Sequence, residues 1–90
     1  MVDEKVWRRS ENWVGTSVED AFVMISLEHG QYVSLNPTAT DVWEAIETPD
    51  TIDHIVDKLT ARYDVSAEHC RKSVSDLLVK LEGMGLVSSS

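Results

Sequence analysis

Apolar and polar positions divide the chain into a strand-like first part and a helical second part. Three short runs are rich in β-branched and aromatic residues: 13–18 (WVGTSV), 21–28 (AFVMISLE) and 31–35 (QYVSL). Glu19-Asp20 and His29-Gly30 separate them as turn residues. This pattern predicts three antiparallel strands joined by hairpins. Residues 1–12 are mostly polar, and we expect them to be loosely ordered, although Val6 and Trp7 could dock on the fold.

The register of the second hairpin decides which side chains share a face, because a shift by one residue exchanges the two faces of a strand. A three-residue loop with Gly30 in the left-handed conformation would place Gln31 opposite Leu27. We favour this register over a two-residue turn. It puts Val23, Ile25, Leu27, Val33 and Leu35 on one face, and Met24, Ser26, Tyr32 and Ser34 on the other.

Apolar residues then recur at helical spacing in three stretches. The stretches contain Ala39, Val42, Trp43 and Ile46; then Ile52, Ile55, Val56, Leu59 and Tyr63; then Cys70, Val74, Leu77, Leu78, Leu81 and Met84. Asn36 and Ser66 suit the N-caps of the first and third helices, Pro37 suits a first helical position, and Gly85 ends the third helix. We predict an α+β, winged-helix-like fold in which a three-stranded antiparallel sheet is followed by three helices. It would form one domain over residues 13–87, with 88–90 as a tail.

Length and composition agree with one small globular domain. The chain has 90 residues, of which 42% are hydrophobic and 27% charged. Its one cysteine, Cys70, excludes an intramolecular disulfide and is typical of reducing compartments. No apolar run is long enough for a signal peptide or a membrane span. We therefore predict a cytoplasmic protein with no membrane partner.

The charge argues against nucleic acid as a partner. The formal net charge is -8, from 16 acidic and 8 basic residues, and this field repels phosphates. A winged-helix DNA-binding protein stays open as an alternative, because the third helix offers basic residues. These are Arg71, Lys72 and Lys80, and Glu68, Asp76 and Glu82 lie among them.

The sequence contains no constellation suited to catalysis or to metal binding. His29, His54 and His69 fall in a turn and in two different helices; no two of them form an i, i+4 pair, and the sequence has no C-x-x-C or H-E-x-x-H motif. His69 and Cys70 are adjacent, so their side chains point about 100° apart on a helix. Cys70 lies on the apolar stripe, where it is expected as a small buried hydrophobe. We predict that the protein is not an enzyme and needs no cofactor.

Peptide docking remains, because a small sheet has an edge with unpaired backbone groups that can accept another strand. If residues 31–35 form an accessible edge beside the third helix, the two elements would enclose a groove. Val79 lies off the apolar stripe of that helix and Leu78 lies at its margin, so apolar side chains there could line such a groove.

An ordered series of segments resembles the PqqD-like family. Gly30-Gln31-Tyr32, Leu35-Asn36-Pro37-Thr38-Ala39 and Trp43 resemble its segment G-x-Y-x-x-L-N-x-x-A-x-x-x-W. Residues 48–65 (TPDTIDHIVDKLTARYDV) resemble its second helix, and residues 70–87 (CRKSVSDLLVKLEGMGLV) resemble its C-terminal helix. The resemblance covers residues 13–87.

The resemblance implies a recognition element that binds the leader of a ribosomally made precursor peptide as an added strand and presents it to modifying enzymes. The segments "LNPTA…VW" and "TPDTID" look most like the stand-alone proteins of lasso-peptide operons, which work with a leader peptidase of cysteine-protease type and an ATP-dependent cyclase. A pyrroloquinoline quinone-type chaperone that delivers its precursor to a radical SAM enzyme is the alternative. Leader-facing positions form no motif in the family, so geometry selects them. The expected contacts are Gln31, Tyr32, Val33, Ser34 and Leu35 on the third strand, and Arg71, Val74, Ser75, Leu78 and Val79 on the third helix.

Overall fold

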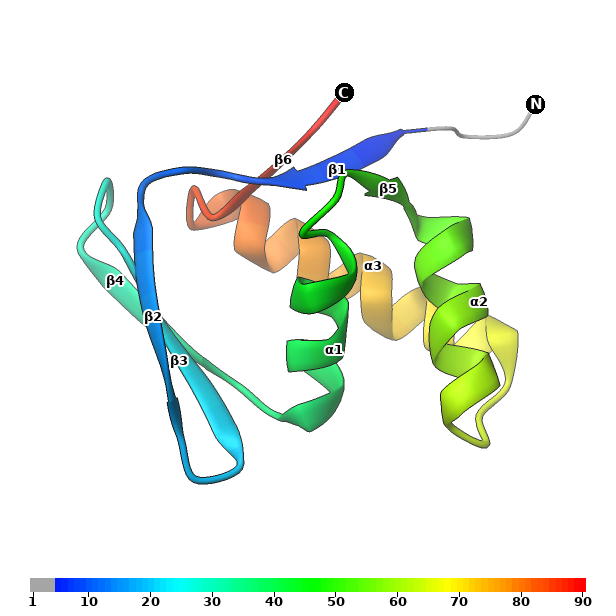
Figure 1. Ribbon diagram of the computed structural model, residues 1–90. Coiled ribbons are helices and arrows are strands. Elements are labelled where there is room, and N and C mark those ends of the chain that lie inside the picture. Colours follow the sequence, from blue (N-terminus) through cyan, green and yellow to red (C-terminus); the bar gives the residue numbers. More distant parts are fainter. Residues whose placement is uncertain (1–4) are drawn as a thin grey trace.

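The structure is a computed structural model that describes residues 5–90. Its elements, in chain order, are β1 (Val6–Arg9), β2 (Trp13–Val18), β3 (Ala21–Ser26), β4 (Gln31–Leu35), α1 (Pro37–Ala45), β5 (Asp50–Thr51), α2 (Ile52–Arg62), α3 (Ala67–Gly83) and β6 (Val87–Ser89). Figure 1 shows the three helices gathered on one side of the sheet formed by β2, β3 and β4, with β1, β5 and β6 above them.

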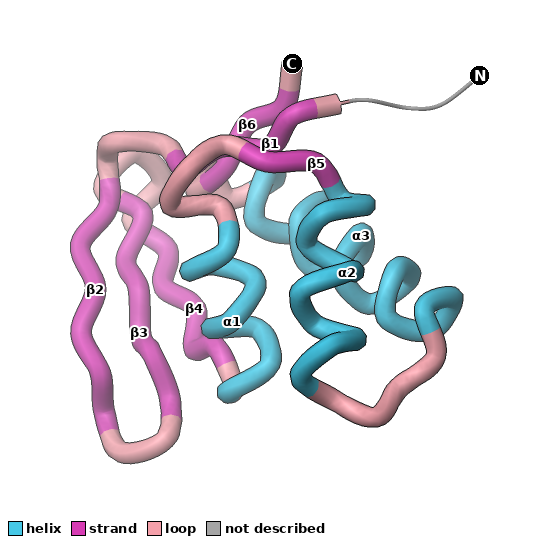
Figure 2. Tube along the Cα trace, turned by 45° about the vertical axis from the view of Figure 1, so that its right-hand side comes forward, coloured by secondary structure: helices cyan, strands magenta, loops and turns pink. Residues whose placement is uncertain are grey.

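The strands form two antiparallel sheets, β2-β3-β4 and β5-β1-β6 (Figure 2). The α+β class, with a three-stranded sheet followed by three helices, is confirmed, whereas the second sheet was not predicted. The expectation of loose structure is wrong for residues 6–9, which form β1, and the expected tail belongs largely to β6. Trp7 on β1 is only 4% exposed. Residues 1–4 of the expected loose segment lie outside the described residues.

Each helix begins at a polar cap. Asn36 Oδ1 accepts from the Ala39 N–H at 2.8 Å, which confirms the predicted cap of α1. The hydroxyls of Thr51 and Ser66 accept from backbone N–H groups three residues on, at 3.3 and 3.2 Å, and cap α2 and α3. These bonds satisfy donors that the first turn of a helix leaves without intrahelical partners.

The apolar stripes of the helices meet the inner face of the β2-β3-β4 sheet in one core. Its buried members are Met24, Val33, Leu35, Val42, Trp43, Ile46, Ile55, Val56, Leu59, Cys70, Val74, Leu78 and Leu81, and Trp7, Leu86 and Val87 extend it to the second sheet. The predicted helical stripes therefore face inward as expected.

The register of the β3–β4 hairpin differs by one residue from the predicted one. Gln31 pairs with Ser26, not with Leu27, and Met24 pairs with Val33. The loop has four residues, closed by a bond from the Gly30 N–H to the Ser26 carbonyl at 2.8 Å. Gly30 does adopt the expected left-handed conformation, with φ 67°.

This register reverses the predicted faces of β3. Met24 and Ser26 point into the core and are 0% exposed, whereas Ile25 and Leu27 face solvent. Ser26 tolerates burial because its hydroxyl accepts from the His29 N–H at 3.3 Å within the hairpin loop.

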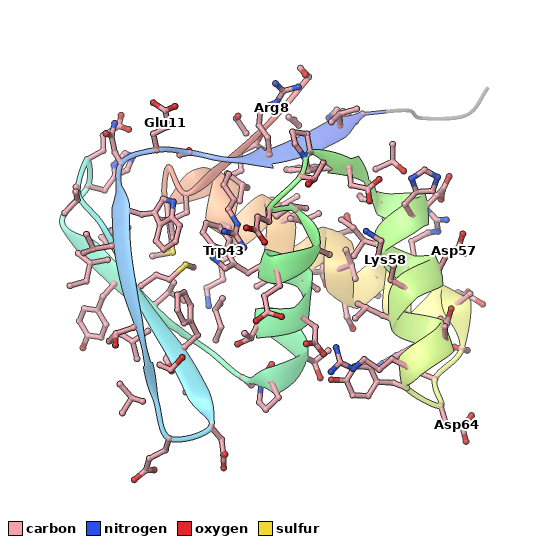
Figure 3. All side chains as sticks on the ribbon, in the orientation of Figure 1. Arg8, Glu11, Trp43, Asp57, Lys58 and Asp64 are labelled. Atoms are coloured by element: carbon pink, nitrogen blue, oxygen red, sulfur yellow. The ribbon has the colours of Figure 1, made fainter. Side chains whose placement is uncertain are left out.

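Arg9 connects the second sheet to α1 and to β2. Its Nε and Nη2 donate to the carbonyl of Trp43 at 3.1 and 2.7 Å. The guanidinium lies 4.6 Å from the centroid of the Trp43 ring and 5.7 Å from that of Trp13. Burial lowers the pKa of this guanidinium, and the carboxylates of Glu47 and Glu44 act in the opposite direction. Figure 3 shows the Trp43 side chain between the β2-β3-β4 sheet and α1, below β1.

Candidate functional site

Strand β4 is an edge strand of its sheet, and no strand within residues 5–90 pairs with its outer side. The Leu27 N–H donates to the Asn12 carbonyl at 3.0 Å, so the backbone of Leu27 faces β2. Backbone groups alternate along an antiparallel strand, so those of Ser26 face β4. On β4, the residues whose backbone groups face β3 are Gln31, Val33 and Leu35. The N–H and C=O groups of Tyr32 and Ser34 therefore point outward, where a second strand can pair with them.

One face of α3 lies alongside this edge. It carries Ser73, Leu77, Lys80 and Met84, which recur at helical spacing. Lys80 and Met84 line a shallow depression of about 490 Å³ together with Gly30, Gln31, Tyr32 and Val33 of the hairpin. The start of β4 and the last turns of α3 are thus the two walls of one groove.

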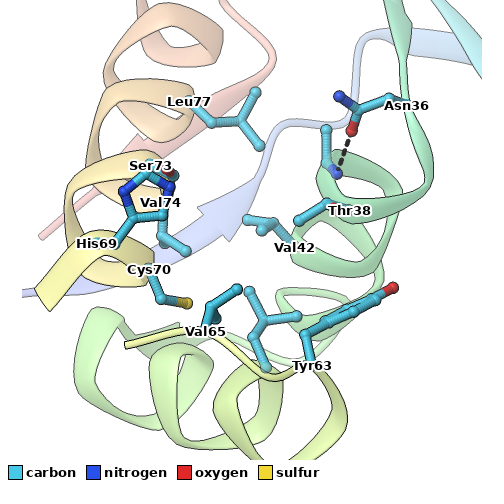
Figure 4. A pocket seen from close by; sticks show the side chains of 12 residues that line it. Asn36, Thr38, Val42, Tyr63, Val65, His69, Cys70, Ser73, Val74 and Leu77 are labelled. Atoms are coloured by element: carbon cyan, nitrogen blue, oxygen red, sulfur yellow. Dashed lines mark hydrogen bonds between the residues drawn. The ribbon is translucent and has the colours of Figure 1, made fainter. Parts of the chain in front are cut away.

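A second depression opens at the other end of β4, where Asn36 follows Leu35. It has a volume of about 410 Å³ and lies between the three helices. Its walls are mainly apolar and include Val42, Leu59, Val65, Val74 and Leu77 (Figure 4). Leu77 lies on the same helix face as Lys80 and Met84, so the edge of β4 runs from one depression to the other.

Two titratable groups, Cys70 and Tyr63, line this second depression between the helices. Burial raises the pKa of the Cys70 thiol, whose residue is 6% exposed. A hydrogen bond donated to the Asp41 carboxylate raises the pKa of the Tyr63 hydroxyl. Both groups are held in their neutral, protonated forms, so this depression offers a mainly apolar surface with no ionised group from either.

The hairpin that carries β4 lies close to the C-terminal end of α3. Gly85, at φ 75°, leaves room for the His29 ring, because a methyl group at Gly85 would lie 2.7 Å from His29 Cδ2 and Nε2. The His29 ring thus lies directly beside Gly85, at the Gly30 end of the groove.

The structure separates the site residues that the sequence predicted into three groups. On β4, the side chains of Gln31, Tyr32 and Ser34 are exposed, whereas those of Val33 and Leu35 are buried. On α3, Val74 and Leu78 are 2% and 0% exposed, so Leu78 supports the groove from the core instead of lying at its margin.

The third group lies on the side of α3 that faces away from β4. Val79 follows Leu77 by two positions, which is a rotation of about 200° around the helix. Arg71 forms an ion pair with Asp53 of α2, and Ser75 lies one turn from both Arg71 and Val79. Arg71, Ser75 and Val79 therefore point away from β4, whereas Lys80 and Met84, which the sequence interpretation did not name as contacts, lie beside the start of β4. Spacing alone could group Ser73, Leu77, Lys80 and Met84, but only the fold shows which helix face meets the strand.

Two further findings describe residues 5–90. No three His, Cys, Asp or Glu side chains in this part of the chain come together as ligands for a metal ion. None of its helices is both long and apolar enough to cross a membrane.

Comparison with known proteins places the chain in a family. The family described as "Coenzyme PQQ synthesis protein D (PqqD)" matches residues 21–87, from β3 to the start of β6. The chain belongs to the PqqD family. None of the curated proteins matches its sequence.

Two solved structures resemble this PqqD-family chain over most of its length. "TbiB1 in Complex with the TbiA(beta) Leader Peptide" is 25% identical, with a TM-score of 0.81, over 90% of this chain and 94% of that one. "Lasso peptide synthetase B1 complexed with the leader peptide" is 18% identical, with a TM-score of 0.80, over 91% and 96% of the two chains. The second likeness establishes a shared fold.

Proposed function

We propose that this PqqD-family chain is a non-catalytic protein that captures the leader of a ribosomal precursor peptide as an added strand on β4. The observation that carries the proposal is the open edge of β4, where the backbone groups of Tyr32 and Ser34 point outward and no strand within residues 5–90 pairs with them. The likeness to TbiB1, which is described in complex with a leader peptide, supports this function.

In this proposal, the backbone and the side chains of a leader contribute differently to binding. Main-chain hydrogen bonds to Tyr32 and Ser34 supply affinity that depends little on leader sequence. Apolar leader side chains entering the depressions beside Met84 and Leu77 supply selectivity. Since the groove walls are already packed on the core, the ordering cost of binding falls mainly on the leader.

The bound leader would be presented to modifying enzymes, with a lasso-peptide leader peptidase of cysteine-protease type and a cyclase favoured. The support for this subtype is the likeness of Leu35–Ala39 and residues 48–53 to stand-alone lasso-operon proteins. Delivery to a radical SAM enzyme is the alternative, and gene order distinguishes the two. A peptidase and an asparagine-synthetase-like cyclase beside the precursor gene would fit the first, and a radical SAM enzyme the second.

DNA binding lacks support in the structure. No Lys or Arg occurs between Arg9 and Lys58, and Arg71 of α3 is already paired with Asp53. Phosphate contacts supply most non-specific DNA affinity, and they require basic side chains facing the duplex.

The experiment is a titration of a labelled leader peptide, encoded by the neighbouring precursor gene, followed by fluorescence anisotropy. Ser34→Pro removes an outward N–H from β4 and should weaken binding by about threefold to tenfold, the equivalent of one lost hydrogen bond. Ser17→Pro is the matched control, because Ser17 is exposed and its N–H likewise points away from β3, but on the opposite edge.

Two results would contradict the proposal. One is that the wild-type protein binds none of the encoded leaders at micromolar concentration. The other is that Ser34→Pro and Ser17→Pro bind the leader equally well while both remain folded by circular dichroism.

A further inference from the structure

The outer face of the β2-β3-β4 sheet is apolar although nothing in the described chain covers it. Val14, Ile25 and Tyr32 lie directly opposite one another across the three strands and form one row. They are 52%, 43% and 75% exposed. Leu27 and Val18 extend the same face along the strands and are 60% and 51% exposed. These side chains form what we call the outer apolar row.

This arrangement departs from what an open antiparallel sheet normally shows. Such a sheet buries one face and presents polar side chains on the other. Here all three helices lie on the inner side of the sheet, and α1 packs directly against β3 and β4 (Figures 1 and 2). The outer face nevertheless carries large hydrophobic side chains on every strand, and contiguous exposed apolar surface of this kind marks interaction sites.

The rim of the outer apolar row is acidic at both ends. Glu19 and Asp20 form the turn between β2 and β3. Glu11 and Glu28 lie at the opposite end, before β2 and in the β3–β4 loop (Figure 3 labels Glu11). The stretch from Ser10 to Asp57 contains no Lys or Arg, so no basic side chain from it offsets these charges.

The acidic rim favours some binding partners for this sheet face and disfavours others. A second copy of the chain, placed face to face, would bring the acidic rims together, and like charges in contact oppose association. A membrane surface or nucleic acid would meet the same repulsion. A protein with an apolar patch surrounded by Lys and Arg is complementary to both the row and its rim.

Tyr32 makes the outer apolar row continuous with the leader-binding edge. Its side chain belongs to the row, and its backbone N–H and C=O belong to the open edge of β4. A strand added at β4 would extend the sheet by one strand, so every second leader side chain would project beside Tyr32 on the outer face. A partner seated on this face would touch both the protein and the leader.

We infer that the outer apolar row is the docking surface for the modifying enzyme, through an enzyme patch with an apolar centre and a basic rim. This inference rests on the proposed leader-binding function. The enzyme recognises a composite surface of β2, β3, β4 and the added leader strand, so it binds the loaded protein more tightly than the empty one.

The test uses the full chain with each purified modifying enzyme encoded beside the precursor gene. Binding is measured by biolayer interferometry, with and without saturating leader peptide. The variant Val14→Thr/Ile25→Thr keeps β-branched side chains on exposed positions but removes the apolar centre. Val79→Thr is the matched control, because Val79 is 57% exposed on the far side of α3. Leader affinity is measured separately for every variant.

The expected result is that the double variant binds one of the enzymes at least about tenfold more weakly while its leader affinity and the enzyme affinity of Val79→Thr stay unchanged. Higher salt should weaken the wild-type complex. The inference would be overturned if the double variant bound the enzymes as tightly as the wild type, or if the wild type bound none of them. Neither result would contradict the proposed leader binding. Sedimentation as a dimer that the double variant abolishes would also overturn the inference, in favour of a second copy as occupant.

Discussion

The connection made by Arg9 gives the sharpest prediction for stability. Arg9→Ala removes two hydrogen bonds to the Trp43 carbonyl, at 3.1 and 2.7 Å, and the stacking of the guanidinium on Trp43 and Trp13. A hydrogen bond from a charged donor contributes about 1.5–3 kcal/mol, counted once because both bonds share the Trp43 carbonyl oxygen, and a partly exposed cation–π contact adds about 0.5–1 kcal/mol. The free energy of unfolding should therefore fall by roughly 2–4 kcal/mol, a large part of the total for a small domain.

The neighbouring residue supplies the control. Arg8 is exposed and makes a single side-chain hydrogen bond, to Ser90 Oγ at 3.1 Å. Arg8→Ala removes the same charge one position away and should change the free energy of unfolding by no more than about 0.5 kcal/mol. Arg9→Lys should lie between the two, because a lysine ammonium cannot reproduce the two-pronged donation of a guanidinium.

The assay is urea unfolding followed by tryptophan fluorescence and circular dichroism. The dependence of the unfolding free energy on urea should be the same for all variants, so that midpoints report stability. Thermal midpoints should fall by about 4–8 °C for each kcal/mol lost. If Arg9→Ala unfolds within 0.5 kcal/mol of Arg8→Ala (a margin of about the size expected for a surface change), the connection contributes nothing and the reasoning is refuted.

Three further changes test separate features. Gly85→Ala should destabilise the fold by about 1–3 kcal/mol, because φ is 75° and the new methyl would meet His29. Gly83→Ala is the control: it has open space around it and should be neutral or stabilising, as measured by thermal unfolding of both variants. Glu19→Gly should stabilise the folded state by about 0.5–1 kcal/mol, because Glu19 has a φ of 55° in the β2–β3 turn, a conformation that glycine adopts more easily. Asp20 has no positive φ, so Asp20→Gly should not stabilise the fold. For Asp50, desolvation opposes ionisation, but hydrogen bonds from Thr51, Lys58 and His54 outweigh it and lower the pKa. Its contribution is therefore complete above about pH 4, near the unfolded-state pKa, and is lost as the pH falls through the native pKa. Urea midpoints measured between about pH 5 and 2 should fall more in the wild type than in Asp50→Asn, while the exposed-site control Asp57→Asn should follow the wild type.

The helices were predictable because each carries its own local signals. An apolar stripe, a polar cap and a glycine or break define α1, α2 and α3 within a short stretch of sequence. The second sheet has no such signal. β5 contains two residues and β6 three, which is too short for an alternating pattern of apolar and polar residues. Both pair with β1, which is far from them in the sequence, so no hairpin turn indicates the pairing.

The predicted hairpin register was wrong, and the helix face that lies beside β4 could not be predicted, for another reason. In the run from Ala21 to Leu27 apolar residues occupy both alternating sets, so hydrophobicity does not choose the inner face. Ser26 would be expected outside on polarity, but its loop hydrogen bond lets it lie in the core. On α3, the position of β4 relative to the helix decides which side chains line the groove. That position depends on how α3 packs on the rest of the chain, which a local pattern does not contain.

The pairing of β1 with β6 has a consequence for how the molecule is made. Val6 and Ser90 exchange backbone hydrogen bonds at 2.9 and 3.0 Å, although almost the whole chain separates them. Contacts between such distant residues close a long loop and form slowly compared with those of neighbouring segments. During synthesis Val6–Arg9 must wait until residues 87–90 have left the ribosome before it finds these partners. Until β6 is available, β1 lacks one of its two neighbouring strands and Trp7 lacks part of its buried surroundings.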